Sequence, residues 1–257
     1  MRYIATYHTD VGISKKTNQD SLAMKIVETK EGKVAFGVVC DGMGGLSKGE
    51  LASKEVIMAF CSWFDDVFVD EVESGSFEES KLIAQWNDII QTQNKRLGEY
   101  GEANNIMLGT TVSALLLYKD NYYIVHVGDS RIYNMSQEVT QLTKDQTFVA
   151  REIEAGRMTE EQAKTDPRRS VLLQCVGASP IVEPEFTKGL IIPESVYMLC
   201  SDGFRHQITD QEMIDKIGPK VCKDEEEMKY GCIYLTELVK NRRETDNITV
   251  AIIKATN

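Results

Sequence analysis

Five aspartates stand at the boundaries of apolar, strand-like runs, each in a context typical of a turn. In the stretches TNQDS, VVCDGMGG, IVHVGDSR, MLCSDGF and ETDNITV they are Asp20, Asp41, Asp129, Asp202 and Asp246. Any one of them alone could be a turn residue, because Asp followed by Gly is a common turn pair. As a group, carboxylates near glycine carbonyls, without a His or Cys cluster, are the donor set of a hard divalent ion such as Mg²⁺ or Mn²⁺.

The other chemistries that these residue types permit have weaker signatures. The three histidines form neither HxH nor HExxH, and His8 and His126 lie in strand-like runs, where a structural role is expected. GxSxG is absent, which argues against a serine nucleophile elbow. The glycines of VVCDGMGG are not followed by the GKS or GKT of a Walker A loop. Metal chemistry is therefore favoured, although spacing alone cannot show that acids so far apart converge.

The composition is that of a globular domain with a sizeable core. The 257 residues are 42% hydrophobic and carry a formal net charge of −11, which disfavours nucleic acid and anionic membranes as partners. Apolar stretches such as 112–118 fall far short of the ~20 residues of a membrane span. The N-terminus has no apolar signal region. Cys40 and Cys200 lie inside strand-like runs without a CxxC pair, which favours buried thiols and a cytoplasmic location.

Residue patterns predict strands in three regions, with helices between them. β-branched and aromatic runs bounded by turn residues predict strands at 2–13, 21–27, 34–40, 110–118, 121–127, 130–134, 139–142, 182–190, 195–200 and 246–254. Apolar residues three or four apart predict helices at 49–64, 80–98 and 224–240. The acidic residues 65–80 are expected to form a loop or helix connection, and 144–180 a charged surface insertion. Strands joined by short turns favour antiparallel pairing.

Seven motifs in order along nearly the whole chain carry a resemblance to a known family. They are KKTNQD (15–20), VVCDGMGG (38–45), GTT (109–111), VGDSR (127–131), LTKDQT (142–147), CSDGF (200–204) and TDNITV (245–250). Together they resemble the metal-dependent protein phosphatases of the protein phosphatase 2C type, and the compact length resembles the bacterial stand-alone branch. One such motif would be weak, but seven in the family's order make a chance match very improbable.

The resemblance implies an α+β fold, a four-layer αββα sandwich of two antiparallel β-sheets flanked by helix pairs. It implies one catalytic domain over 1–257, with a flap-like insertion at about 146–180. The implied activity is hydrolysis of phosphoserine and phosphothreonine in proteins with two Mn²⁺ or Mg²⁺ ions. The implied partners are phosphorylated protein substrates and a cognate Ser/Thr kinase, and nothing in the sequence requires more than a monomer.

The resemblance also implies roles for individual residues. Asp41 corresponds to the acid that bridges both ions, and the Gly42 carbonyl to a member of the second coordination sphere. Asp202 and Asp246 correspond to ligands of one ion. Asp20 corresponds to the acid that reaches the metals directly or through water. A third, weaker site is expected at Asp129, with Asp202 shared.

Four positions depart from the family's pattern. Lys15 stands where the family usually has the arginine that binds substrate phosphate; lysine keeps the charge but loses the planar fork. We expect weaker phosphate binding there, with exposed surface lysines as the alternative. Met43 replaces a histidine general acid of many eukaryotic relatives. Gln19 replaces a frequent glutamate, and His206 stands where some relatives have a metal-binding aspartate, so it is either a proton donor or a surface residue.

The insertion leaves two interpretations open for its arginines. Either they contact phosphopeptide substrate, or they form salt bridges with neighbouring acids, which is the more ordinary role; they are Arg151, Arg157, Arg168 and Arg169.

Two functional alternatives also follow from the sequence. One is a catalytically weak pseudophosphatase that binds phosphoproteins, which Lys15 favours and the five aspartates disfavour. The other is a phosphatase of a stress or sporulation switch, which would usually bring sensor domains.

Overall fold

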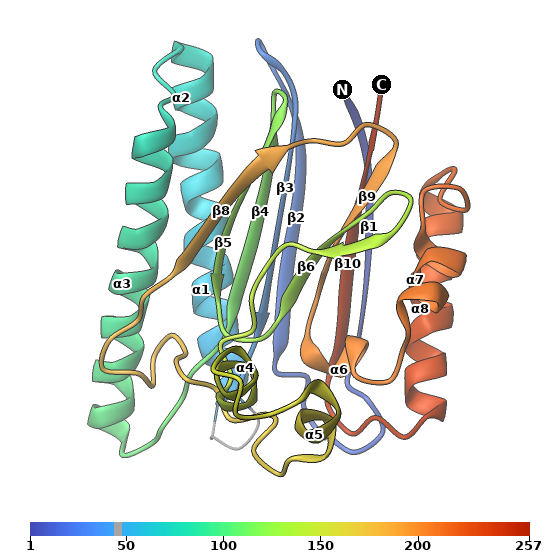
Figure 1. Ribbon diagram of the computed structural model, residues 1–257. Coiled ribbons are helices and arrows are strands. Elements are labelled where there is room, and N and C mark those ends of the chain that lie inside the picture. Colours follow the sequence, from blue (N-terminus) through green and yellow to red (C-terminus); the bar gives the residue numbers. More distant parts are fainter. Residues whose placement is uncertain (44–47) are drawn as a thin grey trace.

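Two five-stranded antiparallel sheets form the centre of the molecule (Figure 1). The computed structural model describes residues 1–43 and 48–257, so Gly44 and Gly45 of VVCDGMGG lie outside the described residues. One sheet has the order β1(Arg2–Asp10), β10(Ile248–Thr256), β9(Ser195–Cys200), β6(Arg131–Met135) and β7(Val139–Gln141). The other has the order β2(Asp20–Thr29), β3(Gly32–Asp41), β4(Val112–Tyr118), β5(Asn121–Val127) and β8(Glu185–Leu190).

Helices cover the outer face of each sheet. A long helical segment, α1(Gly49–Trp63), the π-helix η1(Phe64–Phe68) and α2(Val69–Ser74), lies with α3(Glu79–Asn104) over the β2–β8 sheet. The pair α7(Asp210–Ile217) and α8(Glu225–Asn241) covers the other sheet. The prediction of an αββα sandwich with antiparallel sheets is therefore confirmed. Within the described ranges, no helix is both long and apolar enough to cross a membrane.

Apolar side chains fill each of the three interfaces between the four layers. Phe36 on β3 packs with Phe60 and Phe64 of the long helical segment, on the outer side of its sheet. Between the two sheets, Leu115 and Leu199 belong to one fully buried cluster. The two sheets approach closely at Gly37, where an added Cβ would lie 3.4 Å from a methyl carbon of Leu199. Both faces of each sheet are therefore buried, one against helices and the other against the second sheet.

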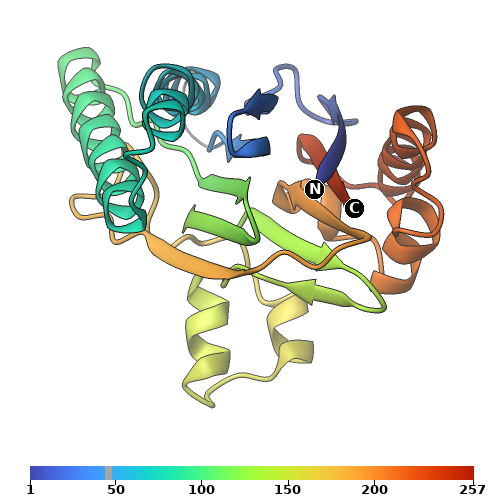
Figure 2. The ribbon, with the colours of Figure 1, turned by 90° about the horizontal axis from the view of Figure 1, so that it is seen from above.

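Two segments differ from the predictions. Residues 65–74 continue the helix from α1 instead of forming a loop, because Phe64, Phe68 and Val72 recur every four residues and are fully buried. The charged insertion contains two short helices, α4(Phe148–Glu154) and α5(Glu160–Thr165). Figure 2 shows both helices projecting away from the layered body. Cys40 and Cys200 are free thiols and fully buried, as predicted.

Candidate active site

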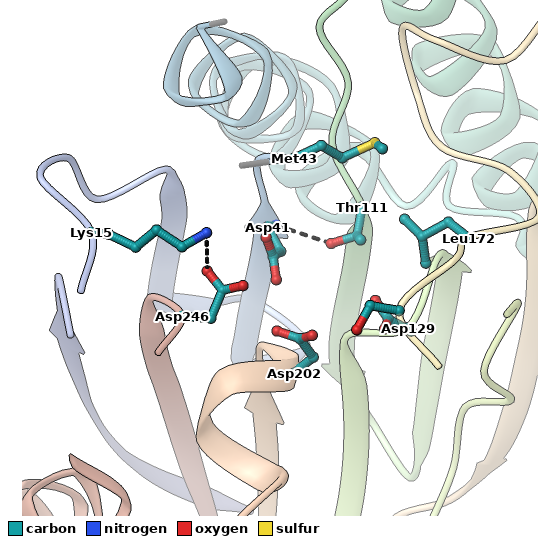
Figure 3. Close-up of a pocket in the computed structure, with 9 residues that line it drawn as sticks. Lys15, Asp41, Met43, Thr111, Asp129, Leu172, Asp202 and Asp246 are labelled. Atoms are coloured by element: carbon teal, nitrogen blue, oxygen red, sulfur yellow. Dashed lines mark hydrogen bonds and ion pairs between the residues drawn. The ribbon is translucent and has the colours of Figure 1, made fainter. Parts of the chain in front are cut away.

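One cavity lies where ends of strands from both sheets meet (Figure 3). Its lining consists of Lys15, Asp41, Met43, Thr111, Asp129, Ser170, Leu172, Asp202 and Asp246. Asp41 is the last residue of β3, whereas Asp202 is the first residue of the short helix α6(Asp202–Arg205), directly after β9. Asp129 and Asp246 lie in the loops after β5 and before β10. Four of the five predicted aspartates therefore line one cavity, and both sheets contribute to it.

The backbone of Asp41 is fixed by the GTT motif. Its N–H donates to Oγ1 of Thr111 at 2.9 Å, and its carbonyl accepts from the N–H of Thr111 at 2.9 Å and from the hydroxyl of Thr110 at 2.9 Å. The Thr111 hydroxyl also lies 2.8 Å from that of Ser130. These bonds hold the Asp41 backbone at the strand end while its carboxylate points into the cavity, as Figure 3 shows.

The fifth aspartate, Asp20, lies beside the cavity and does not line it. It is the direct cross-strand partner of Asp41 in the β2–β3 pair. Its Oδ2 accepts from the Ser201 hydroxyl at 2.8 Å, while its buried Oδ1 has no hydrogen-bond partner among residues 1–43 and 48–257. The Oδ1 of Asp202 is likewise buried without a partner within those ranges. Buried oxygens without donors are costly unless a cation meets them.

Crowding of these acids shifts their pKa values upward. Burial is the main cause that raises the pKa of Asp41 well above its ordinary value, with further contributions from the charges of Asp20 and Asp202. Burial also raises the pKa of Asp20 to about 7, against the hydrogen bonds from Thr249 and Ser201. The pKa of Asp129 rises to about 7, first through burial and then through Asp202. Several carboxylates in one buried place favour either protonation or a bound cation.

Oxygen donors, unpartnered carboxylate oxygens and mutual repulsion all fit a hard divalent ion near Asp41, Asp202 and Asp246. As the side chains stand, no three acidic, His or Cys groups in the described part of the chain form a complete ligand set. Lys15 occupies part of the space, since its Nζ lies 2.9 Å from Oδ1 of Asp246. The site thus brings together oxygen donors that suit a divalent ion, and the ammonium group of Lys15 is paired with one of them, the carboxylate of Asp246.

Asn247 positions the loop that carries Lys15. The Asn247 side chain donates to the carbonyls of Val11 at 2.9 Å and Thr17 at 3.2 Å, and accepts from the N–H of Gln19 at 2.9 Å. The loop is therefore tied at both ends to the residue next to Asp246. Burial would lower the pKa of Lys15, but the bond to Asp246 and the charges of Asp41 and Asp202 raise it, so this side chain is a firmly held cation.

Two glycines permit close backbone approaches at the site. A Cβ on Gly42 would lie 2.3 Å from the carbonyl oxygen of Gly49 and 2.6 Å from that of Gln19. A Cβ on Gly203 would lie 2.2 Å from the carbonyl oxygen of Asn247. The second approach brings the residue after Asp202 against the residue after Asp246, so glycine there sets the spacing of two predicted metal ligands.

We predict that Gly203→Ala destabilises the protein by about 2 kcal/mol, because backbone must move to relieve the overlap with Asn247. Chemical unfolding of the metal-free protein measures the effect without any contribution from bound ions. Gly98→Ala on α3 is the matched control, since its added Cβ would make only ordinary contact at 3.6 Å with Gly177. Equal unfolding midpoints for the two variants would contradict the proposed role of Gly203.

The remaining departures from the family pattern occupy distinct places. Met43 lines the cavity, whereas Gln19 donates to Glu50 at 3.2 Å. His206 lies 3.9 Å from Oδ2 of Asp202 and 3.7 Å from Oε2 of Glu244. His206 therefore differs from an ordinary surface residue, because its ring faces the carboxylates of Asp202 and Glu244 on two sides.

Two of the four arginines in the insertion pair closely with neighbouring acids. Arg157 makes two bonds of 2.7 Å to Glu152, and Arg168 binds Asp166 at 2.8 Å and 3.0 Å. These contacts fit the salt-bridge interpretation of both residues. Arg151 lies 3.6 Å from Glu152, and Arg169 donates to the Lys164 carbonyl at 3.3 Å. The insertion reaches the cavity through other side chains, Ser170 and Leu172.

Sequence reasoning assigned no role to three residues that organise the site. Thr111 and Asn247 stand inside the quoted motifs GTT and TDNITV, so the motifs themselves were the available signal. Arg205 follows CSDGF, and its guanidinium donates to the carbonyl oxygen of Asp129 at 3.1 Å. No residue pattern indicated that contact, because its partners lie about 60 to 76 positions away in the sequence.

Comparisons with known proteins agree with the fold and identify the family of the chain. The family model described as protein phosphatase 2C matches residues 8–230. A protein of Streptococcus pyogenes with the designation protein phosphatase 2C-type is 30% identical over 248 residues, which cover 95% of this chain and 94% of that protein. A solved serine/threonine phosphatase of S. agalactiae aligns with TM-score 0.81 at 28% identity, over 99% of this chain and 100% of that one.

A third relative is the serine/threonine protein phosphatase PstP of Mycobacterium tuberculosis, 30% identical over 256 residues. The match covers 98% of this chain but 44% of that longer protein. A crystal structure of the PstP catalytic domain in complex with two manganese ions aligns with TM-score 0.79 at 27% identity, over 99% of each chain. The chain therefore belongs to the protein phosphatase 2C family.

Proposed function

We propose that the chain hydrolyses phosphoserine and phosphothreonine in proteins, with two Mn²⁺ or Mg²⁺ ions held by Asp41, Asp202 and Asp246. Asp20 and the Gly42 carbonyl contribute directly or through water. The observation that carries the proposal is the convergence of carboxylates from both sheets on one cavity that also holds a lysine. The two manganese ions of the PstP complex support the number of ions.

Besides Asp202 and Asp246, the proposal gives a part to four residues of the cavity lining, Asp41, Lys15, Met43 and Leu172. Two bound ions lower the pKa of a water and meet the charge of the phosphoryl oxygens. The central position of Asp41 among the residues in Figure 3 supports the role proposed for it at both ions. Lys15 supplies a fixed positive charge at the cavity wall for a phosphate oxygen. Met43 and Leu172 contribute apolar surface opposite Lys15. No protein side chain needs to become a covalent nucleophile.

A phosphothreonine peptide tests the proposal directly. Phosphate release should require added Mn²⁺ or Mg²⁺ and should stop on chelation. Turnover that persists without any divalent ion would contradict the two-ion mechanism. Tight binding of the peptide with no turnover under any divalent ion would favour a pseudophosphatase. Cytoplasmic location, a monomeric state and a cognate Ser/Thr kinase stay predictions that rest on the sequence.

We predict that Lys15→Met raises KM for the phosphopeptide about tenfold with a smaller change in kcat, because it removes a charged phosphate partner. Lys15→Arg should retain the wild-type KM or lower it, since the planar fork binds phosphate bidentately. Steady-state kinetics at saturating Mn²⁺ separates KM from kcat. Lys16→Met is the control, since Lys16 is exposed beside it. If both Lys15 variants kept the wild-type KM, Lys15 would not contact phosphate.

A further inference from the structure

Arg205 places a buried positive charge against Asp129. Its Nη2 donates to the Asp129 carbonyl at 3.1 Å and lies 3.7 Å from the Asp129 carboxylate oxygen Oδ2. The same nitrogen is 3.4 Å from Oδ2 of Asp145. The Arg205 side chain is only 9% exposed, and that of Asp129 only 8%. This is a guanidinium packed into the interior, where water screens its charge weakly.

Two guanidiniums offset part of the negative charge around Asp129, which also faces the charge of Asp202. Asp145 receives two bonds of 2.7 Å from Arg131, whose guanidinium also donates to the Tyr133 hydroxyl at 2.8 Å. Two carboxylates, Asp129 and Asp145, therefore meet two guanidiniums. The rest of the cavity differs, because the side chains that line it include three further aspartates and one lysine. Arg205 thus supplies Asp129 with a buried positive charge, whereas Lys15 is the cation that lines the cavity beside Asp246.

A third ion at Asp129, which the family resemblance led us to expect, does not fit these surroundings. An ion on the Asp129 carboxylate would lie beside a buried guanidinium that cannot lose its proton. Arg205 has no easy exit, since it contacts both Asp129 and Asp145 and is almost fully enclosed. The ion would have to displace Arg205 or tolerate its repulsion.

We propose that the Arg205 guanidinium takes the place of a third cation at Asp129, so that this chain binds two divalent ions and not three. Arg205 is thus a positioning residue, which holds Asp129 by a permanent charge. The inference rests on the two-ion site proposed above. It makes the Asp129 side of the cavity independent of the metal concentration, while the side near Asp41 and Asp246 depends on it.

Counting Mn²⁺ ions tests the proposal without using activity. Equilibrium dialysis of the full chain should give two ions for the wild type, and manganese anomalous scattering from crystals should show none on Asp129. Arg205→Ser, with a short neutral side chain, should gain a third ion on Asp129, with affinity at least about tenfold above that of the wild type. Arg205→Lys keeps the charge and should bind two.

Arg242→Ser is the control for loss of an arginine, because Arg242 pairs with Glu212 at 2.6 Å and has no recorded contact with Asp129. It should bind two ions. A third ion on Asp129 in the wild type would overturn the inference and leave the two-ion proposal intact. A wild type that binds no Mn²⁺ would overturn both. If Arg205→Ser fails to fold, the ion counts of the wild type and of Arg205→Lys still test the inference, because three ions in either protein would overturn it.

Discussion

Asp41→Asn is expected to lower kcat for phosphothreonine-peptide hydrolysis roughly a thousandfold. In the proposed function Asp41 serves both ions, and an amide offers one neutral oxygen where the carboxylate offers two charged ones. The backbone of Asp41 is held by Thr110 and Thr111 through bonds that the substitution leaves unchanged. The loss should therefore come from the carboxylate itself and not from a displaced strand.

The same variant should be more stable than the wild type when metal is absent. Burial and neighbouring acids raise the pKa of Asp41 well above its ordinary value, which means that its charge is unfavourable in the folded state. Removing it should raise the melting temperature of the metal-free protein by about 2–4 °C per kcal/mol gained. A general folding defect would lower both activity and stability, so opposite changes identify a site acid.

Phosphate release and thermal unfolding in chelator measure the two effects on one preparation. Asp88→Asn is the matched control, because Asp88 lies exposed on α3 and far along the chain from every cavity acid. It should leave both quantities near their wild-type values. A folded Asp41→Asn protein with wild-type kcat would exclude Asp41 from the metal site.

Removing the divalent ions should abolish hydrolysis and also change how stability depends on pH. The pKa values of Asp20 and Asp129 rise to about 7 in the metal-free fold. For a raised pKa, the stabilising contribution is complete below the ordinary value of 3.8 and is lost as the pH rises through the folded value. Stability of the metal-free protein should therefore fall as the pH rises from about 4 to about 7.5, by up to about 1.4 kcal/mol per pH unit for each group.

One buried group, His126, has the opposite effect on stability, because its contribution is lost as the pH falls. Burial lowers the pKa of His126 to about 4. Its ring accepts from Ser113 or donates to it at 2.9 Å, and it donates to the Gly128 carbonyl at 3.0 Å. Its contribution to stability is present above the ordinary pKa of 6.5 and is lost as the pH falls toward 4. The comparison is therefore cleanest between about pH 6.5 and pH 7.5, where His126 contributes little change.

Urea unfolding in chelator and in excess Mn²⁺ across that interval tests the prediction. Bound ions favour the ionised forms of the acids near Asp41, so the fall in stability should become smaller when Mn²⁺ is present, and the part due to Asp129 should remain. Asp20→Asn should flatten the metal-free profile, because it removes one of the titrating groups. A metal-free protein that gains stability with rising pH over this interval would contradict the assignment of raised pKa values to these acids.

The three main helices were predictable because their apolar periodicity comes from burial on one face. The strands were predictable as β-branched and aromatic runs, which are buried at nearly every position in β4, β9 and β10. The runs predicted at 110–118 and 121–127 also form the hairpin of β4 and β5, with Lys119 at a positive φ of 54° in the turn between them. The continuation of the helix over 65–74 was not predictable from the sequence. Its acidic composition favoured a connection, and the burial of Phe64, Phe68 and Val72 depends on tertiary packing. The helix α7 was missed although Thr209 and Glu212 form a capping box.

The site was predictable in composition but not in geometry. Turn contexts identified all five aspartates, and the family resemblance supplied their grouping. The sequence could not show that Asp20 lies beside the cavity, or that Lys15 contacts Asp246 at 2.9 Å. It could not show that Arg205 meets Asp129 either, because such contacts depend on how the two sheets pack. Local patterns specify elements, and the pairing of charges from distant elements follows only from the assembled fold.

Because the acids come from both sheets, the distances between the acids depend on how the two sheets pack against each other. Asp41 belongs to the sheet that contains β3, and Asp202 and Asp246 adjoin β9 and β10 of the other. The sheets meet through buried side chains such as Leu199, which lies against Gly37. A larger residue at position 37 would shift one sheet against the other and separate the acids before either sheet lost its hydrogen bonds. The rate of hydrolysis would then change with the packing of core residues far from the cavity.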